Sequence, residues 1–258
     1  MKYIASISFG KDSLAMLIKI KELNLPLDEV FYVDIRFDNE AFSGEMPLMK
    51  EFIPKAKKIL KDKYDIEVKN IKAKITFKDQ FYAIKHRGNH IGDNYGFPYV
   101  IGAWCNSRLK IEPIRNYLKK FNEPVIQYVG IAYDEPKRYE RLNHDTHIAP
   151  LYDLKITEEE ALEICKDNDL LSPIYKTSFR GGCWFCPKQS IRQLENLYRN
   201  YPELWNKLKD LEKDSHNSFK PNMTLVELEK RFKNKQMTIF DYEEDCYYNF
   251  KKVGGKYE

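Results

Sequence analysis

The chain has 258 residues, of which 43 are Lys or Arg and 39 are Asp or Glu, so its formal net charge is +4. Hydrophobic residues make up 43% of it, enough for one large domain or for a domain with a small appendage. No apolar run is long enough to span a bilayer and no signal peptide precedes the first strand, so we expect a cytoplasmic protein. Five cysteines, an odd number, argue against a disulfide framework and favour metal-bound or free thiols.

The first stretch, Lys2–Ile7, is apolar and β-prone, and a helical pattern follows over Lys11–Leu23. The loop between them leads directly into the start of the helix, where backbone N–H groups lack partners and the macrodipole favours anions. We therefore expect phosphate oxygens at this loop. Ser8, Ser13 and Lys11 are the expected donors, and Gly10 permits a positive φ and the close approach of a ligand.

The loop reads Ser-Phe-Gly-Lys-Asp-Ser over residues 8–13 and is too short for a Walker-type phosphate loop. It resembles the PP-loop, Ser-Gly-Gly-Lys-Asp-Ser, of the N-type ATP pyrophosphatases, which split ATP between its α- and β-phosphates. The resemblance implies catalytic roles for Lys11 and Asp12 and phosphate contacts by Ser8, Phe9, Gly10, Lys11, Asp12 and Ser13. Phe9 departs from the usual glycine. An ordinary strand–turn–helix junction is the alternative interpretation.

The pattern then repeats, with a buried strand over Val30–Ile35, a helix over Met49–Tyr64 and a third strand over Ile66–Ile75. Such alternation predicts an α/β fold with a doubly wound, mostly parallel, Rossmann-like sheet. Asp34 comes at the carboxyl end of the second strand, where ligands collect in such sheets. It is a candidate contact to nucleotide or Mg²⁺, and a carboxylate that caps the next turn is an equal alternative.

Residues 77–82 open another helix or loop, and the glycine-rich stretch 85–99 is expected to form a long loop. It contains His86 and His90, but Gly88 between them makes a shared helical face for a metal unfavourable. A helix that begins near Cys105 would place this thiol in a positive field, with Arg108 and Lys110 nearby.

A fourth strand, Val125–Gly130, precedes two carboxylates and two arginines. Arg138 and Arg141 are three residues apart, so on a helix they would share a face that suits a diphosphate or a nucleic-acid backbone. An exposed, salt-bridged helix start is the alternative. The run 148–151 is expected to form a fifth short strand, and Thr157 is expected to cap a helix that contains Cys165 as a buried structural thiol.

The second chemical centre is the run 180–187, in which Cys183 and Cys186 are two residues apart after a double glycine. This spacing predicts a metal-binding knuckle, and a redox dithiol is the lower-ranked alternative. Helices over 190–212 and 224–235 predict a small helical C-terminal part. We expect a nucleotide-binding α/β domain over 1–155 and a helical region with the Cys-x-x-Cys over 156–258.

The loop, the Trp-Cys segment and the Cys-x-x-Cys occur in one order that resembles the phosphoadenylyl-sulfate (PAPS) reductase family in the broad sense. That family includes adenylyl-sulfate reductases and DNA-phosphorothioation sulfurtransferases. The resemblance covers roughly residues 1–190, and the residues Gly130, Asp134, Glu135 and Arg138 match its Gly-x-x-x-Asp-Glu-x-x-Arg pattern. It implies a fold of the adenine nucleotide alpha-hydrolase type, a catalytic role for Arg138, and nucleotide contacts by Gly130, Arg138 and Arg141.

The resemblance also implies a [4Fe–4S] cluster held by Cys105, Cys183 and Cys186. Residue 104 is Trp and residue 176 is Lys where related enzymes have a further cysteine. Cys246 or Cys165 is the candidate fourth ligand, unless the fourth iron is open to carry a sulfide. Zn²⁺ with His144 or His147 as an added ligand is the alternative.

These features predict an ATP-dependent sulfurtransferase that uses Mg²⁺, adenylylates tRNA or DNA and inserts sulfur from a cysteine desulfurase or another donor. A homodimer is a candidate assembly, and no membrane partner is expected. One alternative is a reductase of adenylyl sulfate or PAPS, although the reductases' C-terminal Glu-Cys-Gly-Leu-His motif is absent. Another is a non-catalytic PP-loop protein of a mobile element or defence system that binds nucleotide or nucleic acid.

Overall fold

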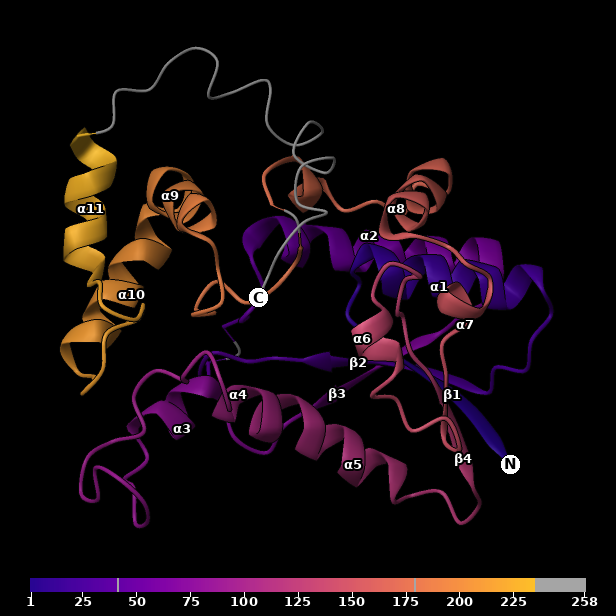
Figure 1. The fold of residues 1–258 in the computed structure, drawn as a ribbon, viewed down its shortest axis with the longest axis horizontal. Helices are drawn as coiled ribbons and strands as arrows, with labels where there is room; N and C mark the ends of the chain where they lie inside the picture. Colours follow the sequence, from indigo (N-terminus) through magenta and orange to yellow (C-terminus); the bar gives the residue numbers. More distant parts are fainter. Residues whose placement is uncertain (41, 179, 235–258) are drawn as a thin grey trace. The chain divides into compact units, whose positions relative to one another are not determined.

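A computed structural model of the chain describes residues 1–40, 42–178 and 180–234. The chain divides into two compact units, each made of two separate segments (Figure 1). The first unit contains Met1–Phe77 and Cys105–Pro173, and the second contains Lys78–Trp104 and Ile174–Glu258. Each unit is described by itself below.

The first unit is built on a five-stranded sheet in the order β3-β2-β1-β4-β5, and every neighbouring pair is parallel. The strands are β1 (Lys2–Ile7), β2 (Glu29–Asp34), β3 (Val68–Lys72), β4 (Val125–Tyr128) and β5 (His147–Ile148). This confirms the predicted α/β, Rossmann-like fold. The fifth strand is shorter than the predicted run 148–151, because Pro150 cannot donate to a ladder and instead starts a helix.

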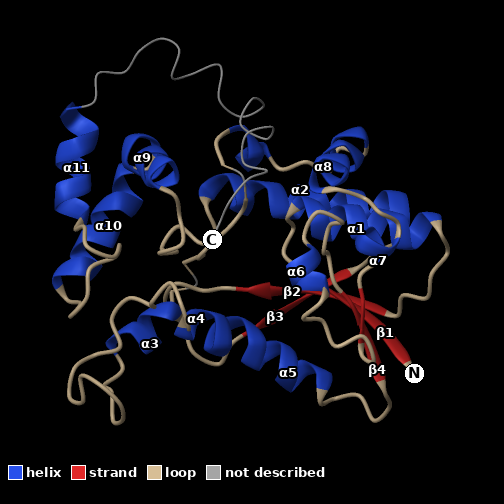
Figure 2. Ribbon diagram, viewed as in Figure 1, coloured by secondary structure: helices blue, strands red, loops and turns tan. Residues whose placement is uncertain are grey.

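Helices cover both sides of this sheet (Figure 2). α1 (Lys11–Glu22), α2 (Pro47–Tyr64) and α8 (Glu158–Asp167) lie on one side, and α5 (Glu112–Leu118) lies on the other. The short helices α6 (Pro136–Tyr139) and α7 (Pro150–Asp153) follow β4 and β5. Because both faces are covered, β1 and β2 are almost continuously apolar, and Ile4, Ala5 and Phe31 have no exposed surface.

α5 continues from two shorter pieces of helix. These are α4 (Trp104–Asn106) and the π-helix η1 (Ser107–Ile111). Pro113 is at the start of α5, where a proline N–H is not needed. The expected helix near Cys105 is therefore present, with a wide turn directly after the cysteine, and π-turns of this kind are frequent at functional sites.

The second unit is helical, with α9 (Ile191–Asn200), α10 (Pro202–Lys213) and α11 (Leu225–Asn234). The one helix predicted over 190–212 is in fact two, because Pro202 lacks an N–H and ends α9 at the residue before Tyr201. Trp205 of α10 packs against Tyr198 and Phe232, with ring centroids 5.5 and 5.9 Å away. The segment before Trp104 joins this unit through Phe97, whose ring lies 5.0 Å from that of Phe219.

α3 (Phe77–Tyr82) settles the earlier choice between helix and loop in favour of a helix. The 3-10 helix η2 (Pro173–Lys176) follows α8. Among the described residues, none of the helices has the length and apolar character that crossing a membrane requires.

Candidate functional site

The site begins at the loop between β1 and α1, beside the point where strand order reverses. The sheet grows outward from β1 in both directions, so the carboxyl ends of β1 and β4 border a crevice of the kind that binds ligands in open α/β sheets. Residues 8–13 follow β1, and Gly130 follows β4 at the same edge. The topology therefore brings two predicted nucleotide-contacting segments together.

Phe9, not Gly10, takes the left-handed backbone conformation in this loop. Its φ is +55°, whereas Gly10 has a φ of −78°, so the positive φ that a glycine permits is not used at residue 10. A positive φ is unfavourable for a bulky residue. Burial compensates, because the Phe9 ring has no exposed surface and meets the Tyr32 ring edge-on at 5.1 Å. The turn that glycine makes in related loops is thus made here by an aromatic anchor.

Three of the loop's polar groups are joined by hydrogen bonds. The Ser13 hydroxyl donates to the Gly10 carbonyl at 2.8 Å and accepts from the Ser8 N–H at 3.4 Å. Gly10 is the N-cap of α1 and provides no side-chain cap. The first turn of α1 therefore keeps the character of an anion site, and the Ser13 hydroxyl shapes the loop that would hold the anion.

Lys11 carries the charge of the loop and is almost completely buried, with 3% of its surface exposed. Its Nζ lies 2.8 Å from a carboxylate oxygen of Asp12 and 2.8 Å from one of Glu158. Burial disfavours the ammonium, but the two carboxylates outweigh it, so the pKa of Lys11 is raised. The positive charge expected at this loop is thus held in place from α8, a helix 147 residues away in sequence.

Asp12 is in the opposite electrostatic position. Burial raises its pKa, and the carboxylates of Glu158 and Glu135 add to the increase, against the lowering effect of Lys11. The carboxylates around the Lys11 ammonium thus carry more negative charge than this one positive charge offsets. Mg²⁺ is usually bound by one or two carboxylates together with substrate phosphates, so this donor set fits a Mg²⁺ that arrives with a nucleotide. No group of three or more metal-ligating side chains occurs among the described residues.

Gly130 makes the close approach between β4 and α1 possible. A Cβ atom at this position would lie 2.9 Å from the carbonyl carbon and oxygen of Asp12 and from the Ser13 nitrogen. All three are backbone atoms, which cannot move aside as a side chain could. A glycine is therefore required here, at the place that the family pattern indicates.

The segment after Gly130 anchors α8 as well. The Asp134 carboxylate accepts a hydrogen bond from the Glu158 N–H at 3.0 Å. Thr157 caps α8 in a complete capping box with Glu160, as predicted. Seven residues after Glu158, the buried Cys165 thiol donates to the Lys11 carbonyl at 3.1 Å. α8 therefore touches Lys11 at its side chain and at its backbone.

The two arginines do not form the predicted pair on one helix face. α6 is four residues long and ends at Tyr139, so Arg141 lies outside it. Arg138 is exposed, and its Nη1 donates to Glu135 at 2.6 Å, which is the salt-bridged alternative stated for this segment. Both arginines stay predicted contacts to nucleotide or nucleic acid.

Asp34 lies half-buried at the carboxyl end of β2, as predicted. Glu45 lies near it and was not singled out in the sequence. Burial raises the pKa of Glu45, Asp34 adds to that effect, and the Tyr32 hydroxyl donates to the Glu45 carboxylate at 2.9 Å. Lys110 acts in the opposite direction on this carboxyl group. Residues from three segments thus meet at the carboxyl edge of the sheet.

The Cys-x-x-Cys forms a compact turn in the second unit. Its backbone closes through Cys186 N–H to Cys183 O at 3.1 Å, and the intervening Trp184 and Phe185 are buried. The buried Gln189 amide donates to the Trp184 carbonyl at 2.7 Å, and the Lys220 ammonium donates to the Pro187 carbonyl at 2.7 Å. The two cysteines remain half-buried, which suits thiolates that bind a metal or cluster.

The three-cysteine set stays a prediction, because Cys105 belongs to the first unit and Cys183 and Cys186 belong to the second. Of the candidate fourth ligands, Cys246 lies outside the described residues. Burial raises the pKa of the Cys165 thiol to about 12, which disfavours the thiolate that a ligand needs. Its surroundings favour the structural interpretation of this cysteine.

The histidines have other neighbours. The His144 ring packs edge-on against Tyr139 at 4.7 Å, and a ring nitrogen of His147 lies 3.1 Å from the Gln127 amide. His90 pairs with Asp93 at 3.4 Å and packs against the His216 ring at 4.8 Å. The long loop over 85–99 thus contacts a segment of its own unit.

Sequence reasoning missed Glu158, Glu45, Gln189 and Lys220. Glu158 is one of three successive glutamates at a helix start, where acidic residues are common, so nothing local distinguishes it. Gln189 had one available signal, since it follows the Cys-x-x-Cys by three residues in a turn that needs a donor for its carbonyls.

Comparison with known families gives one match across most of the chain. The sequence model of the phosphoadenosine phosphosulfate reductase domain matches residues 2–189. This range includes the predicted phosphate loop, residues 8–13, together with Cys105, Gly130 and the Cys-x-x-Cys.

Two relatives come from Methanocaldococcus jannaschii. Uncharacterized protein MJ0066 is 26% identical over 218 residues, which are 79% of this chain and 40% of the relative. Uncharacterized protein MJ0973 is 28% identical over 215 residues, 80% of this chain and 46% of the relative. A nin region protein, ORF290, of Escherichia phage lambda is 34% identical over 104 residues, 39% of this chain and 34% of its own. The chain thus spans less than half the length of these relatives.

Among solved structures, the chain is similar to the U34-tRNA thiolase NcsA from Methanococcus maripaludis, which was determined with its [4Fe–4S] cluster. The identity is 18% and the TM-score is 0.37, with 92% of this chain and 73% of the other covered.

Proposed function

The chain belongs to the phosphoadenosine phosphosulfate reductase domain family, and on this premise we propose that it is an ATP-dependent sulfurtransferase acting on a nucleic-acid acceptor. The observation that carries the proposal is the buried Lys11 ammonium at the uncapped start of α1, beside two carboxylates. A fixed cation and a helix N-terminus favour a polyphosphate, and the Asp12 carboxylate favours the Mg²⁺ that accompanies it.

In the proposed reaction, the β- and γ-phosphates of ATP bind at the loop over residues 8–13. Lys11 exchanges a carboxylate partner for phosphate oxygens and neutralises the charge that develops on pyrophosphate. An oxygen of the acceptor attacks the α-phosphorus, the bond from that phosphorus to the bridging oxygen breaks, and pyrophosphate leaves with the electron pair. The acceptor then carries AMP through that oxygen. A sulfide-level sulfur attacks the acceptor atom that bears this oxygen, the bond between that atom and the oxygen breaks, and AMP leaves with the electron pair. The protein's main contribution is positioning and charge neutralisation.

Cys105, Cys183 and Cys186 are the residues that would hold the metal group. A [4Fe–4S] cluster bound by three thiolates supplies an iron that can carry the incoming sulfur, whereas Zn²⁺ would have a structural role. The half-buried thiols of the Cys-x-x-Cys turn suit either group. A cysteine desulfurase is the proposed sulfur donor.

The decisive test is release of pyrophosphate from ATP by wild-type protein and by Lys11→Met, in the presence of bulk tRNA or single-stranded DNA. We expect Lys11→Met to lower kcat/KM at least about 100-fold, because it removes the positive charge that neutralises the departing pyrophosphate. Lys19→Met, on the same helix but paired with Glu22, is the matched control. If Lys11→Met releases pyrophosphate as fast as wild type, the site assignment is wrong.

A second test addresses the metal. Protein purified without oxygen is analysed for iron, sulfide and zinc, and the Cys183→Ser/Cys186→Ser variant is treated in the same way. We expect about four irons per chain in the wild type and a loss of iron in the variant. Stoichiometric zinc without iron would remove the sulfur-carrier step.

The family match also supports a reductase of adenylyl sulfate or PAPS as a second candidate. That reaction predicts sulfite release with a thiol donor and tighter binding of adenylyl sulfate or PAPS than of ATP. The non-catalytic alternative predicts nucleotide binding without pyrophosphate release. Phe9 departs from the usual glycine of such loops, but it fits the turn through burial and therefore gives the non-catalytic alternative no support.

A further inference from the structure

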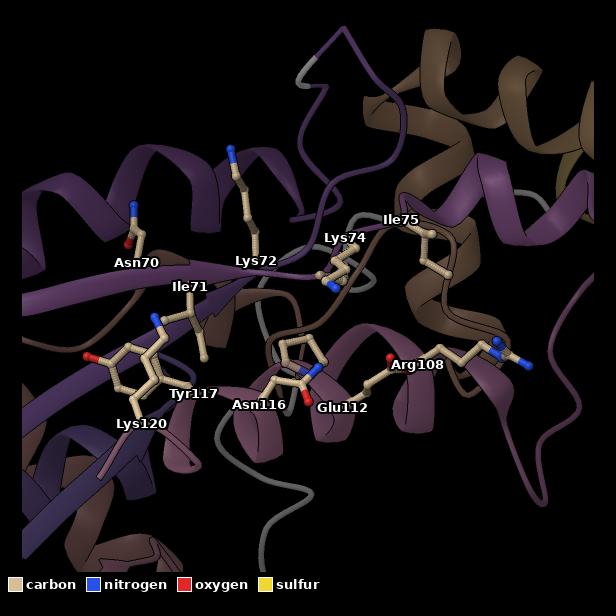
Figure 3. Close-up of a pocket in the computed structure, with 12 residues that line it drawn as sticks. Asn70, Ile71, Lys72, Lys74, Ile75, Arg108, Glu112, Asn116, Tyr117 and Lys120 are labelled. Atoms are coloured by element: carbon tan, nitrogen blue, oxygen red, sulfur yellow. The ribbon is translucent and has the colours of Figure 1, made fainter. Parts of the chain in front are cut away.

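A pocket of about 450 Å³ lies in the first unit, between the carboxyl half of β3 and the helix formed by η1 and α5 (Figure 3). Its volume is within the ordinary range of ligand sites. It is lined by Asn70, Ile71, Lys72, Ala73, Lys74, Ile75, Arg108, Glu112, Pro113, Asn116, Tyr117 and Lys120. None of these residues was assigned to the phosphate loop or the metal ligands.

The two segments that build this pocket are strongly basic. Residues 68–75 and 107–120 contain eight Lys or Arg and one carboxylate, an excess of +7, whereas the whole chain has an excess of only +4. The rest of the chain therefore has a small acidic excess, so these two segments carry more positive charge than the average of the chain. A concentration of that kind is the electrostatic footprint of a polyanion partner.

The interior of the pocket differs from its charged rim. Figure 3 shows Ile71, Asn116 and Tyr117 between the strand and α5, while Lys72 and Asn70 project from the other side of the strand. The Tyr117 ring is fixed, since its hydroxyl donates to Glu29 at 2.6 Å and its ring lies 5.0 Å from that of Phe31. Burial, together with Glu29, raises the pKa of Tyr117 to about 12, so this hydroxyl stays a donor.

These features match the needs of one unstacked nucleotide. An aromatic ring and aliphatic side chains offer a surface for the base, the Asn116 amide offers both a donor and an acceptor, and Lys74 and Lys120 offer charge to the phosphates. The Lys120 ammonium lies over the Tyr117 ring, 5.0 Å from its centre, so a base that stacks on this face takes the place of the ammonium.

Lysines on an edge strand also have a simpler explanation, because they discourage pairing with another sheet. β3 is such an edge strand. That explanation covers Lys69 and Lys72, but it gives no reason for Lys74, which follows the strand, for the basic residues on the facing helix, or for a cavity between the two.

We propose that this pocket binds one nucleotide of a single-stranded nucleic-acid acceptor. The inference rests on the proposed function and adds to it the place where the acceptor is held. The location fits, because Lys72 pairs in register with Asp34, and the carboxyl ends of parallel strands share one edge of the sheet. An acceptor bound in this pocket therefore lies at the same edge of the sheet as the phosphate loop.

The experiment measures fluorescence anisotropy of fluorescein-labelled 15-residue oligouridylate and oligothymidylate with the full chain, without ATP, over a range of salt concentrations. Lys74→Glu/Lys120→Glu reverses two charges of the pocket, and Asn116→Asp places a carboxylate in it with almost no change of shape. Lys213→Glu, an exposed lysine of the second unit, is the matched control. Thermal unfolding of each variant reports whether it is folded.

We expect the double variant to bind at least 10-fold more weakly, with a salt slope reduced by about 1.4 for two lost phosphate contacts. Asn116→Asp should bind several-fold more weakly, and Lys213→Glu should bind like wild type. Unchanged affinity in the folded double variant overturns the proposal. Absence of binding by the wild type also overturns it. The same conclusion follows if duplex DNA, measured in the same way, binds as tightly as the single strands and is weakened equally by both pocket variants.

The outcome is separable from that of the proposed function. Binding is measured without ATP, so the pocket can fail this test while wild-type protein still releases pyrophosphate. It can also pass when Lys11→Met shows that the phosphate loop has no role in pyrophosphate release.

Discussion

The phosphate loop and the cysteine turn are organised in different ways. Lys11 is held by Glu158, Asp12 lies against Gly130, and the Lys11 carbonyl accepts from Cys165, so the loop depends on contacts from more than a hundred residues away. The Cys183–Cys186 turn is closed by its neighbours, through its own backbone and Gln189, and Lys220 adds a contact from farther along the chain.

The difference concerns how each site tolerates change. A site built from distant segments is sensitive to any change that shifts one segment, because such a shift also moves the partners of the buried Lys11 ion pair. A locally closed turn keeps its shape as long as its own hydrogen bonds are made. Four predictions test this contrast, from the largest expected effect to the smallest.

Gly130→Ala should be the most damaging. Its Cβ would meet three backbone atoms of Asp12 and Ser13 at 2.9 Å, so β4 and α1 must separate, at a cost of about 1–3 kcal/mol in the free energy of unfolding. We expect ATP affinity, measured by calorimetry, to fall at least about 10-fold. Gly88→Ala is the control, since it meets nothing within 4 Å and has only an unfavourable φ of +80°. Equal ATP affinity in both variants would break the contrast.

Gln189→Leu should damage the cysteine turn alone. It removes the amide that donates to the Trp184 and Cys186 carbonyls at a cost of about 1–3 kcal/mol, mainly at the Trp184 carbonyl, because the Cys186 carbonyl still accepts from the backbone N–H of residue 189 at 3.1 Å. Metal content after purification should fall, while ATP affinity measured by calorimetry should stay at the wild-type value. Lys188→Ala, an exposed neighbour, should change neither. A loss of ATP affinity in Gln189→Leu would contradict the local character of this turn.

Glu158→Gln should strengthen nucleotide binding. Glu158 competes with phosphate for Lys11 and adds to the negative charge around Asp12, so its neutralisation should raise affinity for ATP about fivefold, equivalent to about 1 kcal/mol. Since Glu158 also raises the pKa of Asp12, the acidic limb of the pH profile for ATP binding should move to lower pH. Glu159→Gln, its exposed neighbour, should show neither change. Weaker binding by Glu158→Gln would mean that this residue mainly positions Lys11.

Cys165→Ala should have the smallest effect. The thiol is fully buried and its pKa is raised to about 12 by that burial, so we expect a loss of about 1 kcal/mol in unfolding free energy, measured with urea, from one weak hydrogen bond and a small cavity. Iron content should equal that of wild type. Loss of iron would make Cys165 a ligand.

Much of the fold was predictable from local pattern. β1 has the bounds expected from its apolar run, and α1, α2 and β2 differ from expectation by two residues or fewer at either end, because strand and helix periodicity act over a few residues. The capping box at Thr157 was visible for the same reason. The predictions that were wrong involve a specific neighbour, such as Pro150 at the fifth strand, Pro202 inside a helical run and the early end of α6 before Arg141.

For the site, the sequence alone determined the candidate residues: a lysine at a helix start after the first strand, a glycine after the fourth, and two cysteines in one turn. Only the tertiary structure decided that Phe9 rather than Gly10 makes the loop's turn, that Glu158 holds Lys11, and that segment 78–104 packs with residues beyond 174. The physical reason is that dihedral preference and periodicity are properties of neighbouring residues. Burial, charge pairing and close backbone approach depend on residues that the chain brings together only when it folds.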